Sequence, residues 1–342
     1  MAGPLADRPG PASDRSRRIA DLLAWLAVAL AAAAAGAGLF VAGLYRDAAG
    51  WVQQAQGADL STLALATPVF VLAVRTGRQG AVAGRLAALG VVLYLAYTYA
   101  VSAFSVAINP LTVVYIAVLG LSAWASLLSV AALDTATANR LVDDRLPRRT
   151  TATFLIAVAL LFGLLWLGQL ASVALSGRPP DELSRLGLPT NPIYALDLAF
   201  FLPACVVAAV SVLRRARTRL LAPSLLVFSA LIGTEILGGF LFTAGADEPV
   251  PIPVAVVLGA VTLVAAALAW LALGPRGTPG AVESEHPWAG LGIALGAGIG
   301  AGLGIVVAVL LALEIASGIV AGAAAGVVVG LLGGAGLERS RS

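Results

Sequence analysis

The chain has 342 residues, of which 60% are hydrophobic and only 11% are charged, and its mean hydropathy is +0.96. A soluble domain needs a charged surface, so this composition excludes an ordinary soluble protein and indicates an integral membrane protein. All 21 basic residues are Arg, which we interpret as a composition bias, so the net charge of +3 is uninformative about nucleic acid; we expect the lipid bilayer, and not nucleic acid, as a partner.

The residues of common active sites are scarce. Cys205 is the only cysteine and lies in an apolar run, which excludes a disulfide or a thiol pair. His286 is the only histidine, which excludes a histidine-rich metal site and a haem held by two histidines. No Ser–His or Cys–His arrangement can be built. We therefore expect no metal, no cofactor and no catalytic residue.

Runs of about 20 apolar residues match the thickness of a bilayer when they are helical. They predict an eight-span transmembrane core over residues 19–274, after a disordered cytoplasmic N-terminus over residues 1–18. Pro68 lies inside the short second span, where we expect a kink. The predicted spans are 19–44, 60–75, 86–108, 110–133, 151–176, 193–213, 220–243 and 254–274.

The segment between the first two spans contains aromatic residues and glutamines. Tyr45 and Trp51 suit a membrane interface, and the glutamines give the segment one polar side. We expect a short interfacial helix here; the alternative is a lid over an outer pocket.

The distribution of arginines predicts the orientation. With the N-terminus inside, eighteen arginines fall in cytoplasmic segments and only Arg46, Arg178 and Arg185 fall in outer loops. Cytoplasmic loops carry an excess of basic residues, so both termini are predicted to be cytoplasmic.

Two glycine series distinguish the C-terminal region. We expect a cytoplasmic linker at 275–288, a transmembrane hairpin at 289–336 and a cytoplasmic tail at 337–342. Glycines recur every fourth residue from Gly292 to Gly304 and from Gly318 to Gly334, which lets two helix backbones approach closely. The hairpin is predicted to dock on the core or to mediate homo-oligomerisation. The predicted fold is thus an all-α polytopic transmembrane bundle of about ten spans.

Polar side chains form one stripe along the third span. At about 100° per residue, these positions share one helix face. Such a stripe faces protein or water rather than lipid, so it either hydrogen-bonds neighbouring helices or lines a cavity. Its members are Tyr94, Tyr97, Thr98, Ser102, Ser105 and Asn109.

Polar groups on other spans lie near the same outer side. Asp197 follows the helix start at Asn191-Pro192, and Glu235 lies deeper, between Gly233 and Gly238-Gly239. Acids inside a membrane are costly, which makes them candidate functional residues. Asp197 has the alternative role of a capping carboxyl, so Glu235 is the preferred functional residue. We predict an outward-facing pocket formed by Asp59, Tyr97, Asn109, Gln169, Asp197 and Glu235.

Several segments resemble an uncharacterised family of bacterial polytopic membrane proteins. The resemblance covers residues 20–245 and implies an eight-span core in a bacterial plasma membrane, with no known chemistry. It rests on Leu-Tyr45-Arg-Asp, Gln-Gly-Ala-Asp59-Leu, the Asn109-Pro110 turn, Asn191-Pro192 with Leu196-Asp197-Leu-Ala-Phe-Phe-Leu-Pro203, and Leu221-Ala-Pro-Ser-Leu-Leu-Val-Phe228.

Three functions remain open. The first is a transporter-like or ligand-binding protein with an outward pocket, linked to protons through Glu235 and Asp197. The second is a membrane scaffold or assembly protein whose polar groups only hold helices together. The third is a lipid-handling enzyme at the outer face, suggested by Asp47 and Asp59 near the first external loop.

Overall fold

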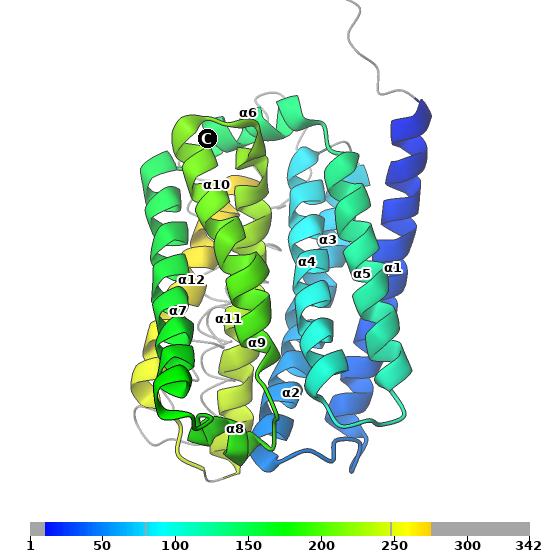
Figure 1. Ribbon diagram of the computed structural model, residues 1–342. Coiled ribbons are helices and arrows are strands. Elements are labelled where there is room, and N and C mark those ends of the chain that lie inside the picture. The colour runs from blue at the N-terminus through cyan, green and yellow to red at the C-terminus, as the bar shows by residue number, and fades with distance from the viewer. Residues whose placement is uncertain (1–10, 79–80, 247, 275–342) are drawn as a thin grey trace, which may run out of the picture.

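The computed structural model describes residues 11–78, 81–246 and 248–274 (Figure 1). These residues form helices and turns and contain no strand. Eight helical spans among them are long and apolar enough to cross a bilayer, which confirms an all-α bundle of a multi-pass membrane protein. The linker, the glycine hairpin and the C-terminal tail lie outside the described residues, so the predictions for them stay untested.

The eight spans are formed by ten α-helices, two of which are joined to their continuation by a π-helical turn. The spans are α1 (Pro11–Phe40), α2 (Ala49–Ser61) with α3 (Thr67–Arg78), α4 (Val82–Ser105), α5 (Thr112–Ala131), α7 (Arg148–Ser176), α9 (Pro192–Leu196) with α10 (Leu202–Arg214), α11 (Ala222–Gly245) and α12 (Ile252–Leu273). Two short helices, α6 (Thr135–Arg145) and α8 (Asp181–Leu186), lie in loops, and a 3-10 segment covers Arg217–Leu221. Helix α1 begins ahead of the predicted first span, so residues 11–18 are helical.

The helices form two groups in Figure 1. Helices α1 to α5 lie on one side and α7 to α12 on the other. Helix α11 joins the groups, because it packs against α2, α4 and α12 and is the most buried of the eight spans. The site described below lies around this helix.

Glycines allow the backbones to approach α11 closely. A Cβ atom at Gly57 on α2 would lie only 2.1 Å from the backbone nitrogen of Gly239. A Cβ at Gly90 on α4 would lie 2.6 Å from Cβ of Val227. In a membrane, where lipid is as apolar as leucine, such close packing of small residues is a main source of helix association.

The segment before Asp59 is not the expected interfacial helix. Residues 49–61 form the first half of the second span, which runs from Ala49 to Gly77. Trp51 is buried against Leu183 and Leu188, and the hydroxyl of Thr243 donates a hydrogen bond of 2.9 Å to Gln53. Helix α11 therefore satisfies polar groups of α2 that the hydropathy pattern assigns to water.

The second and sixth spans each contain a π-helical turn followed by proline. The turns cover Thr62–Ala66 and Asp197–Phe201, and Pro68 and Pro203 follow at the same interval. A proline ring clashes with the carbonyl one turn earlier and leaves it without an N–H partner, and the wider π turn makes room for the ring. In the second span the Thr67 hydroxyl also donates to the carbonyl of Thr62, at 2.8 Å.

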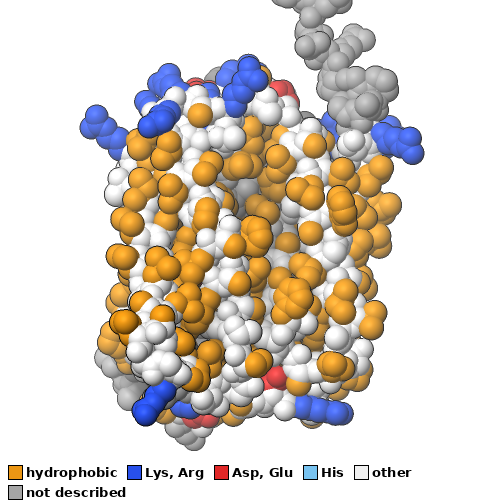
Figure 2. Space-filling view, viewed as in Figure 1, with side chains coloured by type: hydrophobic (Ala, Val, Ile, Leu, Met, Phe, Trp, Pro, Cys, Tyr) orange, Lys and Arg blue, Asp and Glu red, His pale blue; other side chains and the backbone are white. Residues whose placement is uncertain are grey.

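Arginines gather at one end of the molecule. Figure 2 shows most of the visible arginines at the end where α6 lies, above a broad apolar band that covers the middle of the molecule. At this end Arg219 forms an ion pair of 2.8 Å with Asp143, and Asn139 donates to the carbonyl of Arg217 at 3.0 Å. This distribution agrees with the predicted orientation, in which the arginine-rich end is cytoplasmic and the opposite end is outside.

Replacing Gly57 by alanine tests the contact between α2 and α11. The added methyl group would overlap the backbone of Gly239, and overpacking of this kind costs about 1–3 kcal/mol. We expect Gly57→Ala to lower the midpoint of thermal unfolding in detergent, measured by size-exclusion chromatography of the heated protein.

Gly120→Ala on α5 is the matched control, because no atom lies within 4 Å of an added Cβ there. Alanine favours helix more than glycine does, so this variant should unfold at the same temperature as the parent or higher. Equal stability of the two variants would contradict the importance of the Gly57 contact.

Candidate functional site

Asp197 is a buried carboxyl held by side chains from two other helices. The Tyr97 hydroxyl of α4 donates to its Oδ1 at 2.8 Å, and the Trp166 indole of α7 donates to its Oδ2 at 2.7 Å. Asp197 is only 6% exposed. Both carboxyl oxygens therefore have a donor, and α4, α7 and α9 are linked through one side chain.

The local sequence explains how Asp197 reaches this position. The side chain of Asn191 caps the N-terminus of α9 by accepting from the backbone N–H of Ile193 at 2.9 Å, and Pro192 occupies the first helical turn. Asp197 then begins the π turn. It does not cap the helix, because its carboxyl bonds only to side chains among the described residues.

A second layer surrounds Asp197 on its outer side. The Tyr194 hydroxyl donates to Oε1 of Gln169, and the Tyr194 ring lies 5.0 Å from the Trp166 ring. Trp166 and Gln169 are three residues apart on α7, as Tyr194 and Asp197 are on the sixth span. Both pairs therefore lie on one helix face each, and the two faces meet.

Glu235 lies on the other flank of α4. Thr98 donates to its Oε2 at 2.7 Å. Tyr97 and Thr98 are consecutive residues, so α4 holds the Asp197 and Glu235 carboxyls at the same depth. We refer to Tyr97, Thr98, Trp166, Asp197 and Glu235 as the Asp197–Glu235 cluster. Glu235 and Tyr97 keep some exposed surface although they lie within the bundle.

Aromatic rings pack beside the cluster, towards the arginine-rich end of the bundle. The rings of Tyr97 and Phe228 are 5.4 Å apart in an edge-to-face arrangement, and those of Phe201 and Phe228 are 4.7 Å apart. Phe201 lies one turn after Asp197 and Phe228 two turns before Glu235, and in both helices this is the direction of the arginine-rich end. The side of the cluster that faces the arginine-rich end is therefore lined by aromatic rings.

Asp59 belongs to a neighbouring site rather than to the outer mouth of its span. It is 7% exposed, and the Tyr45 hydroxyl donates to its Oδ2 at 2.6 Å. Burial, together with the nearby Asp59 carboxyl, raises the pKa of the Tyr45 phenol, so the phenol remains a donor. No hydrogen bond within the described ranges joins Asp59 to the Asp197–Glu235 cluster.

Asn109 has a role in the turn between α4 and α5. Its Oδ1 accepts from the backbone N–H of Leu111 at 2.8 Å, a typical turn interaction of asparagine before proline. Its backbone N–H donates to the Thr112 hydroxyl at 3.0 Å. The structure therefore places Tyr97, Gln169, Asp197 and Glu235 around one region, while Asp59 and Asn109 lie beside it.

The sequence analysis did not identify three residues that donate hydrogen bonds to the predicted site residues: Trp166, Tyr194 and Tyr45. Trp166 and Tyr194 were not predicted as site residues, although each lies three residues before a polar residue that was. Tyr45 was assigned to the interface and instead binds Asp59. A search for aromatic donors one helix turn from each intramembrane polar group would find Trp166 and Tyr194.

The chemistry of the cluster is that of carboxyls without a fixed cationic partner. Across the described part of the chain, no arginine forms an ion pair with Asp59, Asp197 or Glu235. No group of three or more His, Cys, Asp or Glu side chains in that part could hold a metal ion. Carboxyls supported only by hydroxyl and indole donors can bind a proton or an organic cation.

Gly38→Ala tests the fit around Asp59. A Cβ at Gly38 on α1 would lie 1.8 Å from Asp59 Oδ2 and 2.7 Å from the Tyr45 hydroxyl. We expect the free energy of unfolding to fall by about 1–3 kcal/mol, seen as a lower unfolding temperature in detergent, because the added methyl displaces a partly buried hydrogen-bonded pair.

Gly36→Ala is the matched control two residues away on the same helix, with no atom within 4 Å of the added Cβ. Removal of the Asp59 carboxyl takes away the shortest contact and leaves the one with the Tyr45 hydroxyl, so Gly38→Ala should have a smaller effect in an Asp59→Ala background. Equal effects in both backgrounds would show that Gly38 acts through another contact.

Neither a protein-family model, nor a curated protein, nor a solved structure matches this chain. The resemblance to a bacterial family therefore stays a prediction, and the function is argued from the geometry of the multi-pass bundle.

Proposed function

We propose that the chain is a transporter-like membrane protein whose Asp197–Glu235 cluster binds a proton or a small organic cation from the outer side. The proposal rests on one observation above all. Two carboxyls lie inside the bundle, each supported by a hydroxyl from consecutive residues of α4, and no arginine within the described ranges neutralises either of them. A negative site of this kind is costly in a membrane unless it takes up positive charge.

The one-sided arrangement favours access from outside. Asp197 and Gln169 lie towards the predicted outer ends of their spans, and Phe201 and Phe228 follow the carboxyls towards the arginine-rich end, with their rings 4.7 Å apart. Glu235 retains exposed surface within the bundle. A pocket that opens outward and is closed inward by aromatic rings fits these positions.

The repeated π turns also favour a transport function. They lie in the second and sixth spans, which are corresponding members of two groups of four. Interrupted helices at corresponding positions of two halves often form the binding site in secondary transporters, and π turns inside helices are frequent at functional sites. One of these turns begins at Asp197 itself.

A scaffold or assembly protein is the second candidate. Its supporting observation is that Asp59, Asp197 and Glu235 each accept a hydrogen bond from a neighbouring element, as groups that only fasten helices would. The enzyme hypothesis has less support, because Asp47 accepts a 2.8 Å hydrogen bond from the backbone of Ala107 and Asp59 is buried.

The proposal includes the location and assembly of the chain. We place it in a bacterial plasma membrane, in keeping with its arginine bias and with the family that its residues resemble. The glycine series at 292–304 and 318–334 would supply a contact for a second copy. Cross-linking of the full chain in native membranes, compared with a chain truncated after residue 288, tests that contact.

Glu235→Gln separates the two candidate functions. Proteoliposomes containing the purified protein would be exposed to a pH step and to a panel of small primary and quaternary amines on a solid-supported membrane. We expect the parent to give a transient current with the pH step or with one amine. Glu235→Gln should abolish it, because the amide cannot bind a proton or balance a cation, and Asp197→Asn should reduce it less.

Glu248→Gln is the matched control. This substitution removes the same charge, but at an exposed position on the predicted outer side of the membrane. It should leave the current unchanged. If Glu235→Gln folds and gives the parental current, or if the parent gives no current and the variant only lowers thermal stability, the transport proposal fails and the scaffold function is favoured.

A further inference from the structure

A cavity lies at the cytoplasmic end of the bundle, away from the Asp197–Glu235 cluster. It has a volume of about 280 Å³, is partly open to the surface and is lined mainly by α1, α3, α4 and α5. This volume is close to the lower limit of small-molecule sites, which are roughly 300–1,000 Å³. The proposed transport function does not use this cavity.

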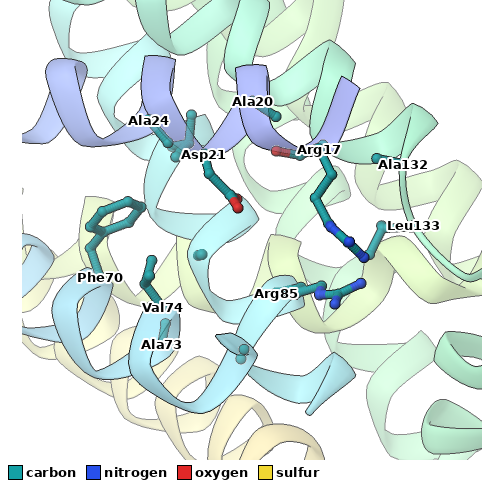
Figure 3. Close-up of a pocket in the computed structure, with 15 residues that line it drawn as sticks. Arg17, Ala20, Asp21, Ala24, Phe70, Ala73, Val74, Arg85, Ala132 and Leu133 are labelled. Carbon is teal, nitrogen blue, oxygen red and sulfur yellow. The ribbon is translucent and has the colours of Figure 1, made fainter. Parts of the chain in front are cut away.

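Two arginines from different helices line the cavity. Arg17 extends from α1 and Arg85 from α4, and Figure 3 shows their guanidinium groups pointing towards one another. Arg85 has no hydrogen-bond acceptor or ion-pair partner among the residues that the structure describes. Two like charges converge only at a cost, which an anion between them removes.

The remainder of the lining is mostly apolar. Phe70 and Val92 form part of the wall deeper in the membrane, and Ser129 of α5 adds a hydroxyl. Asp21, one helix turn after Arg17, is the acid in this lining. Two arginines and one aspartate leave one positive charge, which matches one negative charge on a ligand.

The position of the cavity matches the headgroup level of the inner leaflet. Arg17 and Arg85 lie close to the cytoplasmic ends of their spans, which begin at Arg15 and Val82. Anionic lipids of the cytoplasmic leaflet bind in basic pockets between transmembrane helices. Guanidinium groups bind phosphate oxygens in a bidentate manner.

We propose that this cavity binds the phosphate of a monoanionic phospholipid of the inner leaflet. Arg17 and Arg85 hold the phosphate, Ser129 contributes a further donor, and the apolar wall of Phe70 and Val92 contacts the start of an acyl chain. The site takes one headgroup, and the remaining chain lies along the bundle surface.

Native mass spectrometry of the full chain tests the site. The protein would be delipidated and returned to detergent micelles doped with phosphatidylglycerol, with phosphatidylcholine, or with inorganic phosphate alone. We expect one retained phosphatidylglycerol per chain, far less phosphatidylcholine, and no displacement by millimolar phosphate. Arg85→Gln and Arg17→Gln should each weaken retention about tenfold, because each removes a charge-assisted contact.

Arg75→Gln is the matched control, since Arg75 is exposed on α3 at the same end and does not line the cavity. It should retain the lipid like the parent. Equal losses in Arg75→Gln and Arg85→Gln would overturn the proposal in favour of unspecific surface charge. Displacement of the lipid by free phosphate, or equal retention of phosphatidylcholine, would overturn it as well.

Discussion

The close approach of α2 and α11 is the contact on which the arrangement of the bundle depends. Gly57 lies directly on the backbone of Gly239, and no side chain can be placed between them. Lipid provides no hydrophobic drive for this contact, so it depends on close packing and on interhelical hydrogen bonds. One of these joins Ser61 and Thr234 at 2.9 Å. The same contact fixes the rotation of α11, and hence the direction in which the neighbouring Glu235 faces.

Helix α4 converts this packing into a polar site. Gly90 brings α4 against Val227 of α11, and about two turns further along α4 the consecutive residues Tyr97 and Thr98 face different neighbours. One receives the carboxyl of Asp197 and the other that of Glu235. Because an unpaired carboxyl in this surrounding would be costly, the two hydrogen bonds and the two glycine contacts support one another. A change in either set alters the position of both acids.

The sequence predicted the eight spans well because insertion into a bilayer depends on apolar length, which hydropathy measures directly. It also selected Tyr97, Gln169, Asp197 and Glu235, since intramembrane polar groups are rare. It failed where a contact with another helix decides the outcome. Residues 49–59 were predicted to lie at the membrane interface with one polar side. In the structure Thr243 of α11 donates to the Gln53 side chain, and Gly57 allows α2 to pack directly on the α11 backbone. Trp166 was not predicted as a site residue, and only the approach of the sixth span shows that its indole donates to Asp197.

The two π turns occupy corresponding spans, but they differ in the hydrogen bonds and helix contacts that hold them in place. In the second span the Thr62 carbonyl receives both the backbone N–H of Thr67 and the Thr67 hydroxyl, and the span packs tightly on α11. In the sixth span Leu202 occupies the place of Thr67 and offers only its backbone N–H. That span packs mainly on α7 rather than on α11. The π turn that carries Asp197 is therefore the less restrained of the two. The two carboxyls thus differ in opposite ways. Asp197 has a donor on each oxygen but lies on the helix with fewer contacts to α11, whereas among the described residues Glu235 has one donor, Thr98, and lies on the most buried helix.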